Sequence, residues 1–307
     1  MQARPFIKWV GGKRQLIEQL EVLLPRGFAS WKEVTYIEPF VGGGAMLFHL
    51  LQKYPNINHA VINDINPDLT TCYRVIRDEP DELLRALDEL QSIYYSLINE
   101  ETRKDFYLQK RLRYNTCAMS AVEKSSLFIF LNRTCFNGLY RVNKSGGFNV
   151  PFGKYESPTI CDRRTILADS YLLRNVEIMT GDFENTLEKL LPGKKTLFYF
   201  DPPYRPLSNT SSFNNYAKEG FADPEQIRLK NFCDRISAIE DAYFMLSNSD
   251  CLAKNGQDRF FDDLYVAYNI KRVFASRAVN ADPTRRGKLT EILVRNFDIS
   301  IESPTLI

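Results

Sequence analysis

Seven short apolar runs along the chain have the composition of buried strands. Each is rich in β-branched or aromatic residues and is bounded by polar or turn-forming residues, which is typical of strands inside a sheet. Helical patterns lie between several of them, and this alternation predicts an α/β fold with a mainly parallel, doubly wound sheet of seven strands. The runs are TYIEPF from Thr35, HAVINDI from His59, VEIMTGDF from Val176, TLFYFDPPY from Thr196, AYFMLSNS from Ala242, YNIKRVFA from Tyr268 and EILVRNF from Glu291.

One helix start can be predicted residue by residue. In Asp223-Pro224-Glu225-Gln226, the aspartate has the N-cap position, the proline the first helical position and the glutamine the third. The apolar face of this helix is expected to consist of Ile227, Phe232, Ile236 and Ile239.

The interval from residue 70 to 162 interrupts the alternation of strands and helices. Leu127 to Leu131 predicts a buried helical segment, and Leu139–Asn143 and Phe148–Pro151 flank the turn Lys144-Ser145-Gly146-Gly147, as in a β-hairpin. We therefore predict a main domain of residues 1–69 and 163–307, with a largely helical domain of residues 70–162 inserted in it. An earlier helix in the insert is indicated by the spacing of Leu83, Leu87, Leu90, Tyr94 and Leu97.

Composition narrows the class of protein. The 307 residues are 44% hydrophobic and 25% charged, which is ordinary for a globular protein. No apolar run reaches the roughly 18 residues that a membrane span needs, and MQARPFIKW lacks the apolar core of a signal peptide. We expect a cytoplasmic protein without a membrane partner.

Cysteine and histidine are used sparingly. The six cysteines include no C-x-x-C pair, and the only histidines are His49 and His59. We expect reduced, structural thiols and no metal site, and mechanisms that need an imidazole base are disfavoured.

Charge is segregated along the chain, although the net charge is only +2. Residues 132–155 carry four bases and no acid, and residues 271–288 carry six bases against Asp282. Such stretches suit phosphate contacts, but a solvated basic loop remains an alternative for residues 271–288. The bases of the first stretch are Arg133, Arg141, Lys144 and Lys154.

Acidic residues follow four of the predicted strands. Glu38 precedes the glycine-rich loop Val41-Gly42-Gly43-Gly44, whose backbone could approach a ligand closely, although the full G-x-G-x-x-G spacing is missing. Asp64 ends the second strand, where an acid can bind ribose hydroxyls. Each acid alone could be a solvated loop residue or a helix cap, but this edge is where open α/β sheets bind ligands. The four acids are Glu38, Asp64, Asp182 and Asp201.

The fourth acid belongs to the stretch TLFYFDPPYRPL. Pro202 and Pro203 cannot extend a sheet or continue into a helix, so the chain must end the strand in a stiff turn. The Asp201 carboxylate and the Pro202 carbonyl would then be free acceptors beside the ring of Tyr204, a set that suits an amino group on a flat ring. A strand that merely ends in a proline-rich turn is equally compatible with the stretch alone.

The segment FIKWVGGK near the N-terminus resembles a phosphate loop only in part. The G-x-x-x-x-G-K-[ST] spacing is absent and Arg14 follows Lys13, so we exclude a nucleoside triphosphatase. An adenosyl ligand without phosphates fits better.

Taken together, these motifs resemble the Dam-type DNA adenine N6-methyltransferases, the D12 class of the alpha group of amino-methyltransferases. The blocks occur in the order of that family, and the likeness covers nearly the whole chain. It implies a Rossmann-like methyltransferase sheet and an inserted target-recognition domain. The blocks are KWVGGKRQL, EPFVGGGAM, NDINPDL, FNGLYRVN with FNVPFGKY, GDF and FDPPYRPLSNTSSF.

The resemblance also implies an activity. The expected reaction is methyl transfer from S-adenosylmethionine to N6 of an adenine flipped out of double-stranded DNA, with GATC as the expected site. A monomeric bacterial or phage enzyme is implied, with a cognate restriction endonuclease as a separate companion in a restriction-modification system.

The resemblance implies a role for individual residues of this sequence, where they match the motifs of the family. The expected catalytic residues are Asp201, Pro202, Pro203 and Tyr204. The expected cofactor contacts are Trp9, Lys13, Glu38, Phe40, Gly42, Gly44, Asp64, Asp182, Phe183 and Asp201. The expected DNA contacts are Arg133, Phe136, Asn137, Leu139, Arg141, Asn143, Pro151 and Lys154, with Arg141 at a guanine, Phe136 and Asn137 inside the duplex, and Leu139 and Pro151 at base edges.

Two alternatives remain. An RNA amino-methyltransferase can use the same sheet and D-P-P-Y loop, but it would not need a hairpin between the second and third strands. A DNA-binding module with a vestigial cofactor fold is disfavoured by the intact Asp201-Pro202-Pro203-Tyr204 motif.

Overall fold

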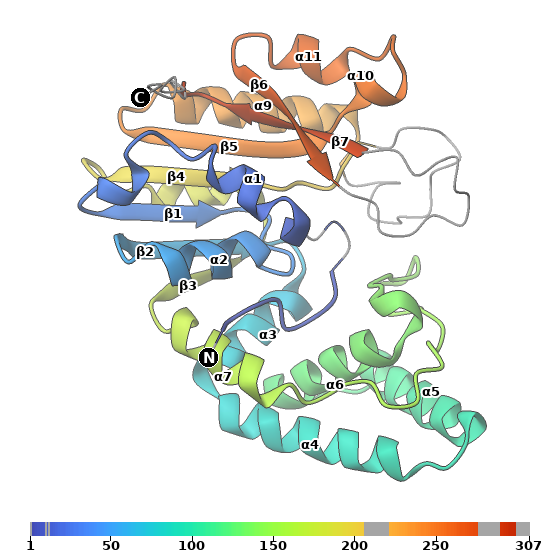
Figure 1. Cartoon of the computed structure of the whole chain (residues 1–307). Helices are drawn as coiled ribbons and strands as arrows, with labels where there is room; N and C mark the ends of the chain where they lie inside the picture. The colour runs from blue at the N-terminus through green and yellow to red at the C-terminus, as the bar shows by residue number, and fades with distance from the viewer. Residues whose placement is uncertain (1, 10, 12, 206–220, 276–288, 299–307) are drawn as a thin grey trace, which may run out of the picture. The chain divides into compact units, whose positions relative to one another are not determined.

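A single seven-stranded sheet organises the protein (Figure 1). The computed structural model describes residues 2–9, 11, 13–205, 221–275 and 289–298. The strand order is β3-β2-β1-β4-β5-β7-β6, and all seven predicted strands are confirmed. Their bounds are β1 Val34–Glu38, β2 Ile57–Asp64, β3 Val176–Thr180, β4 Lys195–Phe200, β5 Ala242–Ser249, β6 Asn269–Ala275 and β7 Leu289–Arg295.

Strand direction changes within this sheet. β4 pairs in parallel with β1 and with β5, where Phe198 is aligned with Phe244. β7 runs antiparallel to both of its neighbours, β5 and β6, and it aligns Glu291 with Ser249. Because of this reversal, Glu291 near the start of β7 lies beside the carboxyl end of β5. The expected mainly parallel sheet is therefore a mixed one.

The chain divides into two compact units. The first comprises Met1–Gly12, Val41–Lys53 and Ile62–Phe183, and the second comprises Lys13–Phe40, Tyr54–Val61 and Glu184–Ile307. Each unit is described separately below.

In the second unit, β4 provides the centre of the core. Leu197 to Phe200 are all buried, as expected for a strand covered on both faces. Helix α9, Asp223–Ser237, packs against β5 (Figure 1), and its Phe232 meets the rings of Phe198 and Phe200 edge-on at 6.3 and 5.9 Å. The shorter helices of this unit are η1 Lys13–Gln15, α1 Ile17–Glu21, η2 Phe28–Ser30, α10 Cys251–Lys254 and α11 Phe260–Leu264, and η4 Phe183–Lys189 begins at the unit boundary.

The start of α9 differs from the prediction by one position. Ala222 is the N-cap, and Asp223 is the first helical residue, because its carboxylate binds Arg205 instead of capping the helix. The predicted apolar face was also wrong at Ile227, which is 44% exposed, whereas the polar Gln226 is fully buried. Gln226 replaces an apolar residue there because both ends of its amide are hydrogen bonded.

The first unit is mainly helical. Helix α6 contacts α3, α4 and α5, and it is buried around most of its circumference, so the apolar segment Leu127–Leu131 is confirmed as a buried helix. Side-chain caps begin α3, α5, α6 and α7, at Asn66, Asn99, Ser120 and Asp162. The helices are α2 Ala45–Lys53, α3 Pro67–Asp78, α4 Pro80–Ser96, α5 Glu100–Thr116, α6 Ala121–Thr134 and α7 Arg163–Leu173, with the short η3 Phe136–Gly138.

The predicted hairpin is present as a chain reversal, but its strands are not formed. Only isolated antiparallel bridges join Val142 to Phe148 and Cys135 to Phe152. The turn depends on Asn143, whose side-chain oxygen accepts hydrogen bonds from the backbone N–H groups of Ser145 and Gly147 at 3.1 and 2.8 Å. No helix in the described part of the chain is long and apolar enough to span a membrane.

Candidate active site

A buried lysine lies at the centre of a polar cluster in the second unit, Lys13, Asp201, Tyr204 and Glu291, which we name the catalytic cluster after the role expected of Asp201 and Tyr204. Lys13 is only 4% exposed. Its Nζ lies 2.8 Å from Asp201 Oδ1 and 3.2 Å from Glu291 Oε2. A buried ammonium must be paired, and two carboxylates provide the pairing here.

Tyr204 completes this cluster. Its hydroxyl donates a hydrogen bond to Glu291 Oε2 at 2.5 Å and accepts one from Lys13 Nζ. The Lys13 ammonium also lies 4.3 Å from the centre of the Tyr204 ring, within cation–π range. Tyr204 is therefore fixed by both of its partners.

The charges of the cluster follow from its burial. Burial raises the pKa of Asp201, Lys13 lowers it and Glu291 raises it, and together they set it at about 6. Burial alone would lower the pKa of Lys13, but the two carboxylates outweigh burial and raise it. Burial and both carboxylates raise the pKa of Tyr204 well above its ordinary value. Two carboxylates and one ammonium therefore share the cluster, so its acidic groups outnumber its basic one.

The turn after β4 is held by polar contacts. Gln226 on α9 donates its side-chain amide to the Pro203 carbonyl oxygen at 3.1 Å, and accepts a hydrogen bond from Asn248 at 3.0 Å. No hydrogen bond to the Pro202 carbonyl oxygen is found within the described ranges. Among the described residues, the Pro203 carbonyl is thus hydrogen bonded and the Pro202 carbonyl is not.

Arg205 anchors the far side of the same turn. Its guanidinium binds both carboxylate oxygens of Asp223, at 2.6 and 3.1 Å, and Asp258 at 2.7 Å. It also lies over the ring of Phe260. These contacts fix the backbone directly after Tyr204.

Two further expected cofactor residues lie in the second unit. Glu38, at the end of β1, is 2% exposed and accepts a hydrogen bond from the Tyr36 hydroxyl at 2.7 Å. Phe40 meets Phe200 and Phe221 edge-on. Glu38 adds a buried acidic group near the carboxyl end of β1.

The glycine loop of the first unit needs its glycines. Gly42 has φ of +48° and Gly44 has φ of +72°, both in the left-handed region. A Cβ on Gly42 would lie 2.8 Å from the Trp9 ring, and a Cβ on Gly44 would lie 2.5 Å from the Tyr73 hydroxyl. The loop therefore packs closely against Trp9.

Asp64 ties this loop to the end of β2. Its Oδ2 accepts a hydrogen bond from Gly42 N at 3.1 Å, and its Oδ1 accepts one from Asn66 N at 2.9 Å. Burial raises the pKa of Asp64 to about 6, although these N–H groups lower it. Gly181 N donates to the Asp64 carbonyl at 3.1 Å, which joins the ends of β2 and β3. Asp182 and the buried Phe183 follow directly.

The segment after α6 presents an aromatic side chain to solvent. Phe136 is 51% exposed, and Asn137 next to it has φ of +55°, an uncommon conformation for a residue other than glycine. Arg141 is held by Asn149, with its Nε 2.7 Å from Oδ1 and a terminal nitrogen 3.1 Å from the Asn149 carbonyl. Tyr140 turns inward and stacks on Trp9 at 5.5 Å between ring centres.

The chain can now be compared with known proteins. The family model described as D12 class N6 adenine-specific DNA methyltransferase matches residues 9–279. The chain belongs to this family. It is therefore an adenine-specific DNA methyltransferase, with DNA as its substrate and a need for a methyl donor.

Relatives of this D12 methyltransferase match along nearly its whole length. It is 44% identical to the type II methyltransferase M.MjaIII of Methanocaldococcus jannaschii, over 97% of this chain and 100% of that protein. It is 38% identical to the type II methyltransferase M1.LlaDCHI of Lactococcus lactis, over 96% of this chain and 95% of that protein. It is 29% identical to a DNA adenine methylase of Haemophilus influenzae, over 95% of this chain and 93% of that protein.

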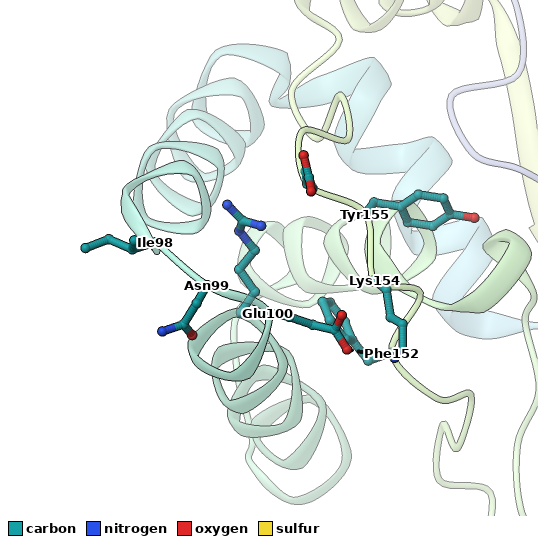
Figure 2. A pocket seen from close by; sticks show the side chains of 8 residues that line it. Ile98, Asn99, Glu100, Phe152, Lys154 and Tyr155 are labelled. Atoms are coloured by element: carbon teal, nitrogen blue, oxygen red, sulfur yellow. Dashed lines mark ion pairs between the residues drawn. The ribbon is translucent and has the colours of Figure 1, made fainter.

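Several expected DNA contacts of the methyltransferase are engaged within the first unit. Arg133 donates to the Phe6 carbonyl at 2.6 Å, and burial lowers its pKa. Lys154 pairs with Glu100 at 2.8 Å in a pocket of about 250 Å³ at the start of α5 (Figure 2). Of the predicted site residues, only Lys154 lines that pocket. Leu139 is half-buried, whereas Pro151 is exposed.

The basic stretch 271–288 is only partly described. Lys271 is exposed, while Arg272 pairs with Asp250 at 3.0 Å and Asp262 at 2.8 Å. The remaining bases of this stretch, and the segment PLSNTSSF after Arg205, lie outside the described residues.

Sequence reasoning missed two residues of the methyltransferase site, Glu291 and Gln226. Both are polar side chains at positions that are otherwise apolar, Glu291 in β7 and Gln226 on the buried face of α9, and both are at least nine-tenths buried. The signal that could have identified them is this mismatch, because buried polar groups must find partners. Glu291 was read only as the first residue of an apolar strand.

Proposed function

We propose that the enzyme transfers the methyl group of S-adenosylmethionine to N6 of an adenine flipped out of double-stranded DNA, within GATC. The observation that carries the proposal is the pair of acceptors after β4. The Asp201 carboxylate and the Pro202 carbonyl are adjacent in the turn, while Gln226 engages the neighbouring Pro203 carbonyl. Two acceptors match the two N6 protons of adenine.

The reaction must first overcome the weak nucleophilicity of N6, whose lone pair is delocalised into the ring. Hydrogen bonds from both N6 protons to Asp201 and Pro202 would localise that pair. S-adenosylmethionine supplies a methyl group activated by a positive sulfur. As the N–C bond would form and the C–S bond break, positive charge would develop on N6, and the two carboxylates of the catalytic cluster would stabilise it. The nitrogen then releases one proton, for which Asp201 is an acceptor.

A donor-binding role is assigned to residues of the first unit. The close-packed Gly42–Gly44 loop beside Trp9 and the Asp64 carboxylate suit an adenosyl group, with Asp182 and Phe183 for its adenine. The other residues expected at the donor, Lys13, Glu38 and Phe40, belong to the second unit. Buried carboxylates favour a cationic donor.

Base flipping costs a few kcal/mol, because the adenine leaves its stack and its pair. Stacking on Tyr204, worth about 1 to 3 kcal/mol, would offset much of that cost. The exposed Phe136 and the adjacent Asn137 are suited to fill the gap left in the duplex.

Sequence reading is assigned to residues 70–162 acting as a target-recognition domain. Arg141, oriented by Asn149, is proposed to bind guanine through two hydrogen bonds, which would add roughly 1 to 3 kcal/mol of discrimination. Leu139, Asn143 and Pro151 are assigned to neighbouring base edges, and Arg133 and Lys154 to the backbone. Lys154 would exchange its Glu100 partner for phosphate.

The relatives named type II methyltransferases support a restriction-modification role. A restriction endonuclease as a separate companion and a monomeric methyltransferase are further parts of the proposal. The decisive experiment supplies S-adenosylmethionine with a labelled methyl group and matched DNA and RNA. We expect label on adenine in GATC duplexes and protection from a GATC nuclease that methylation blocks. Label in RNA alone would show the alternative, an RNA amino-methyltransferase.

A further inference from the structure

Lys13 is shared by two carboxylates, and only one of them belongs to the D-P-P-Y turn. Asp201 is 2.8 Å from Lys13 Nζ and Glu291 is 3.2 Å away, on a different element, β7. Glu291 is only 8% exposed, and its Oε2 also accepts the Tyr204 hydroxyl. A single carboxylate therefore contacts two residues of the catalytic cluster.

This arrangement matters when substrate arrives. An amino group that donates to Asp201 competes with Lys13 for the same carboxylate. A buried ammonium cannot simply lose its partner, because an unpaired buried charge is strongly unfavourable. Among the residues that the structure describes, Glu291 is the second carboxylate that pairs with Lys13.

We propose that Glu291 is a positioning residue for methyl transfer: it retains Lys13 and Tyr204 when the substrate amine engages Asp201. It also provides the second negative charge of the cluster. The inference rests on the proposed function. Without Glu291, Lys13 and Asp201 would form a neutral pair that competes with the amine and no longer stabilises developing positive charge.

The groups that face Asp201 decide how its titration responds. These groups are Lys13 from η1, Tyr204 from the turn, Glu291 from β7 and Tyr199 from β4. The pKa of Tyr199 is raised by burial and also by Asp201, Glu38 and Glu291. Lys13 is the cation among these groups. Removing the charge of Glu291 should therefore lower the pKa of Asp201, since one like charge disappears and Lys13 remains.

The test replaces Glu291 with glutamine, which keeps its shape and an acceptor for Tyr204. In E291Q we expect kcat to fall roughly 10- to 100-fold, less than the loss for a group that touches the developing charge. We also expect the acidic limb of the pH profile of kcat to lie at lower pH in E291Q than in the wild type. Unchanged kcat and an unchanged limb would overturn the proposal.

The matched control is Asp234→Asn. Asp234 lies in the same unit and also contacts a lysine and a tyrosine, Lys230 at 2.7 Å and Tyr268 at 2.6 Å. The control should leave the acidic limb in place. Loss of a carboxylate that contacts a lysine and a tyrosine would by itself affect both variants alike, so an equal shift in D234N would also contradict the proposal.

Two measurements keep the proposal testable if E291Q does not fold or the wild type transfers no methyl group. E291D retains the charge but shortens the side chain. The acidic limb of its pH profile of kcat should therefore stay at the wild-type pH, while kcat itself falls. A kcat equal to that of the wild type would overturn the proposal. A ¹³C-carboxyl NMR titration of Asp201, assigned with D201N, needs no activity. An Asp201 pKa equal in wild type and E291Q would overturn the coupling even where the proposed function had failed separately.

Discussion

The side-chain amide of Gln226 donates a hydrogen bond to the carbonyl oxygen of Pro203 across 3.1 Å. This contact connects a fully buried residue of α9 to the D-P-P-Y turn. Asn248 on β5 binds the other end of the same amide at 3.0 Å, so the orientation of Gln226 is fixed. The peptide that follows the Pro202 carbonyl is thereby held in place.

Gln226→Ala should loosen that turn. We expect a loss of about 1 to 3 kcal/mol in the free energy of unfolding, because Asn248 and Pro203 lose a buried partner. We expect kcat to fall by more than KM changes, since the acceptors rather than the binding surfaces are displaced. Denaturant unfolding and steady-state kinetics check both. Gln257→Ala, at an exposed position, is the control, and equal kcat in the two variants would refute a positioning role for Gln226.

Asp201→Asn should abolish transfer while sparing DNA binding. The amide keeps the shape but loses the charge, and the loss in kcat should reach at least about a hundredfold. In the wild type, the ionised Asp201 carboxylate is the stronger acceptor for the amine and adds the negative charge that faces the developing positive charge. Because its pKa is about 6, kcat should rise as pH passes that value and then level off. Near-normal turnover by D201N or D201A would contradict the assigned role.

Arg141→Ala should relax selection at one guanine of the site. We expect the discrimination in kcat/KM against duplexes changed at that base to shrink by about 1 to 3 kcal/mol. Lys144→Ala, in the exposed turn of the same segment, should weaken binding to all duplexes alike. The comparison uses GATC and single-base variants; unchanged discrimination in R141A would assign base reading to another residue.

Asp169 should make stability depend on pH. It is fully buried on α7 and accepts a hydrogen bond from Arg4 N at 3.0 Å, and burial raises its pKa to about 8. A raised pKa means that the folded state retains a proton that the unfolded state loses. Its contribution is therefore complete below about pH 4 and is lost as pH rises toward 8, by about 1.4 kcal/mol per unit.

Asp169→Asn removes that titration. The difference in free energy of unfolding between D169N and wild type should increase in favour of D169N from pH 5 to pH 8. Chemical denaturation at several pH values measures it. A constant difference would show that Asp169 titrates normally.

The strands were predictable because each is a compact apolar run with its own boundary. The buried α6 helix followed from the same logic, since Leu127 to Leu131 offers no polar face. The strands of the hairpin were not formed, because Asn143 satisfies the turn with its own side chain and leaves only isolated bridges. Local signals thus predict elements better than they predict pairing.

The position of a candidate site residue could be predicted where it stands at the carboxyl end of a predicted strand. Asp64 is the last residue of β2, and Asp201 directly follows β4, as the sequence predicted. Glu291 was not predicted, because β7 is antiparallel and brings the beginning of a strand to the edge where the others finish. Strand direction depends on long-range pairing, which a local pattern does not contain. The N-cap of α9 was predicted one residue too late for a similar reason, because the Asp223 carboxylate binds Arg205, which a local sequence pattern does not show.

The cluster around Lys13 joins the first helical turn of the chain to its last strand. Such a contact closes a very large loop, and it can form only after nearly everything between has been synthesised. A nascent chain still held by the ribosome before β7 emerges would hold Lys13 without Glu291. The complete cluster, and the activity proposed for it, therefore requires β7 to be folded in place.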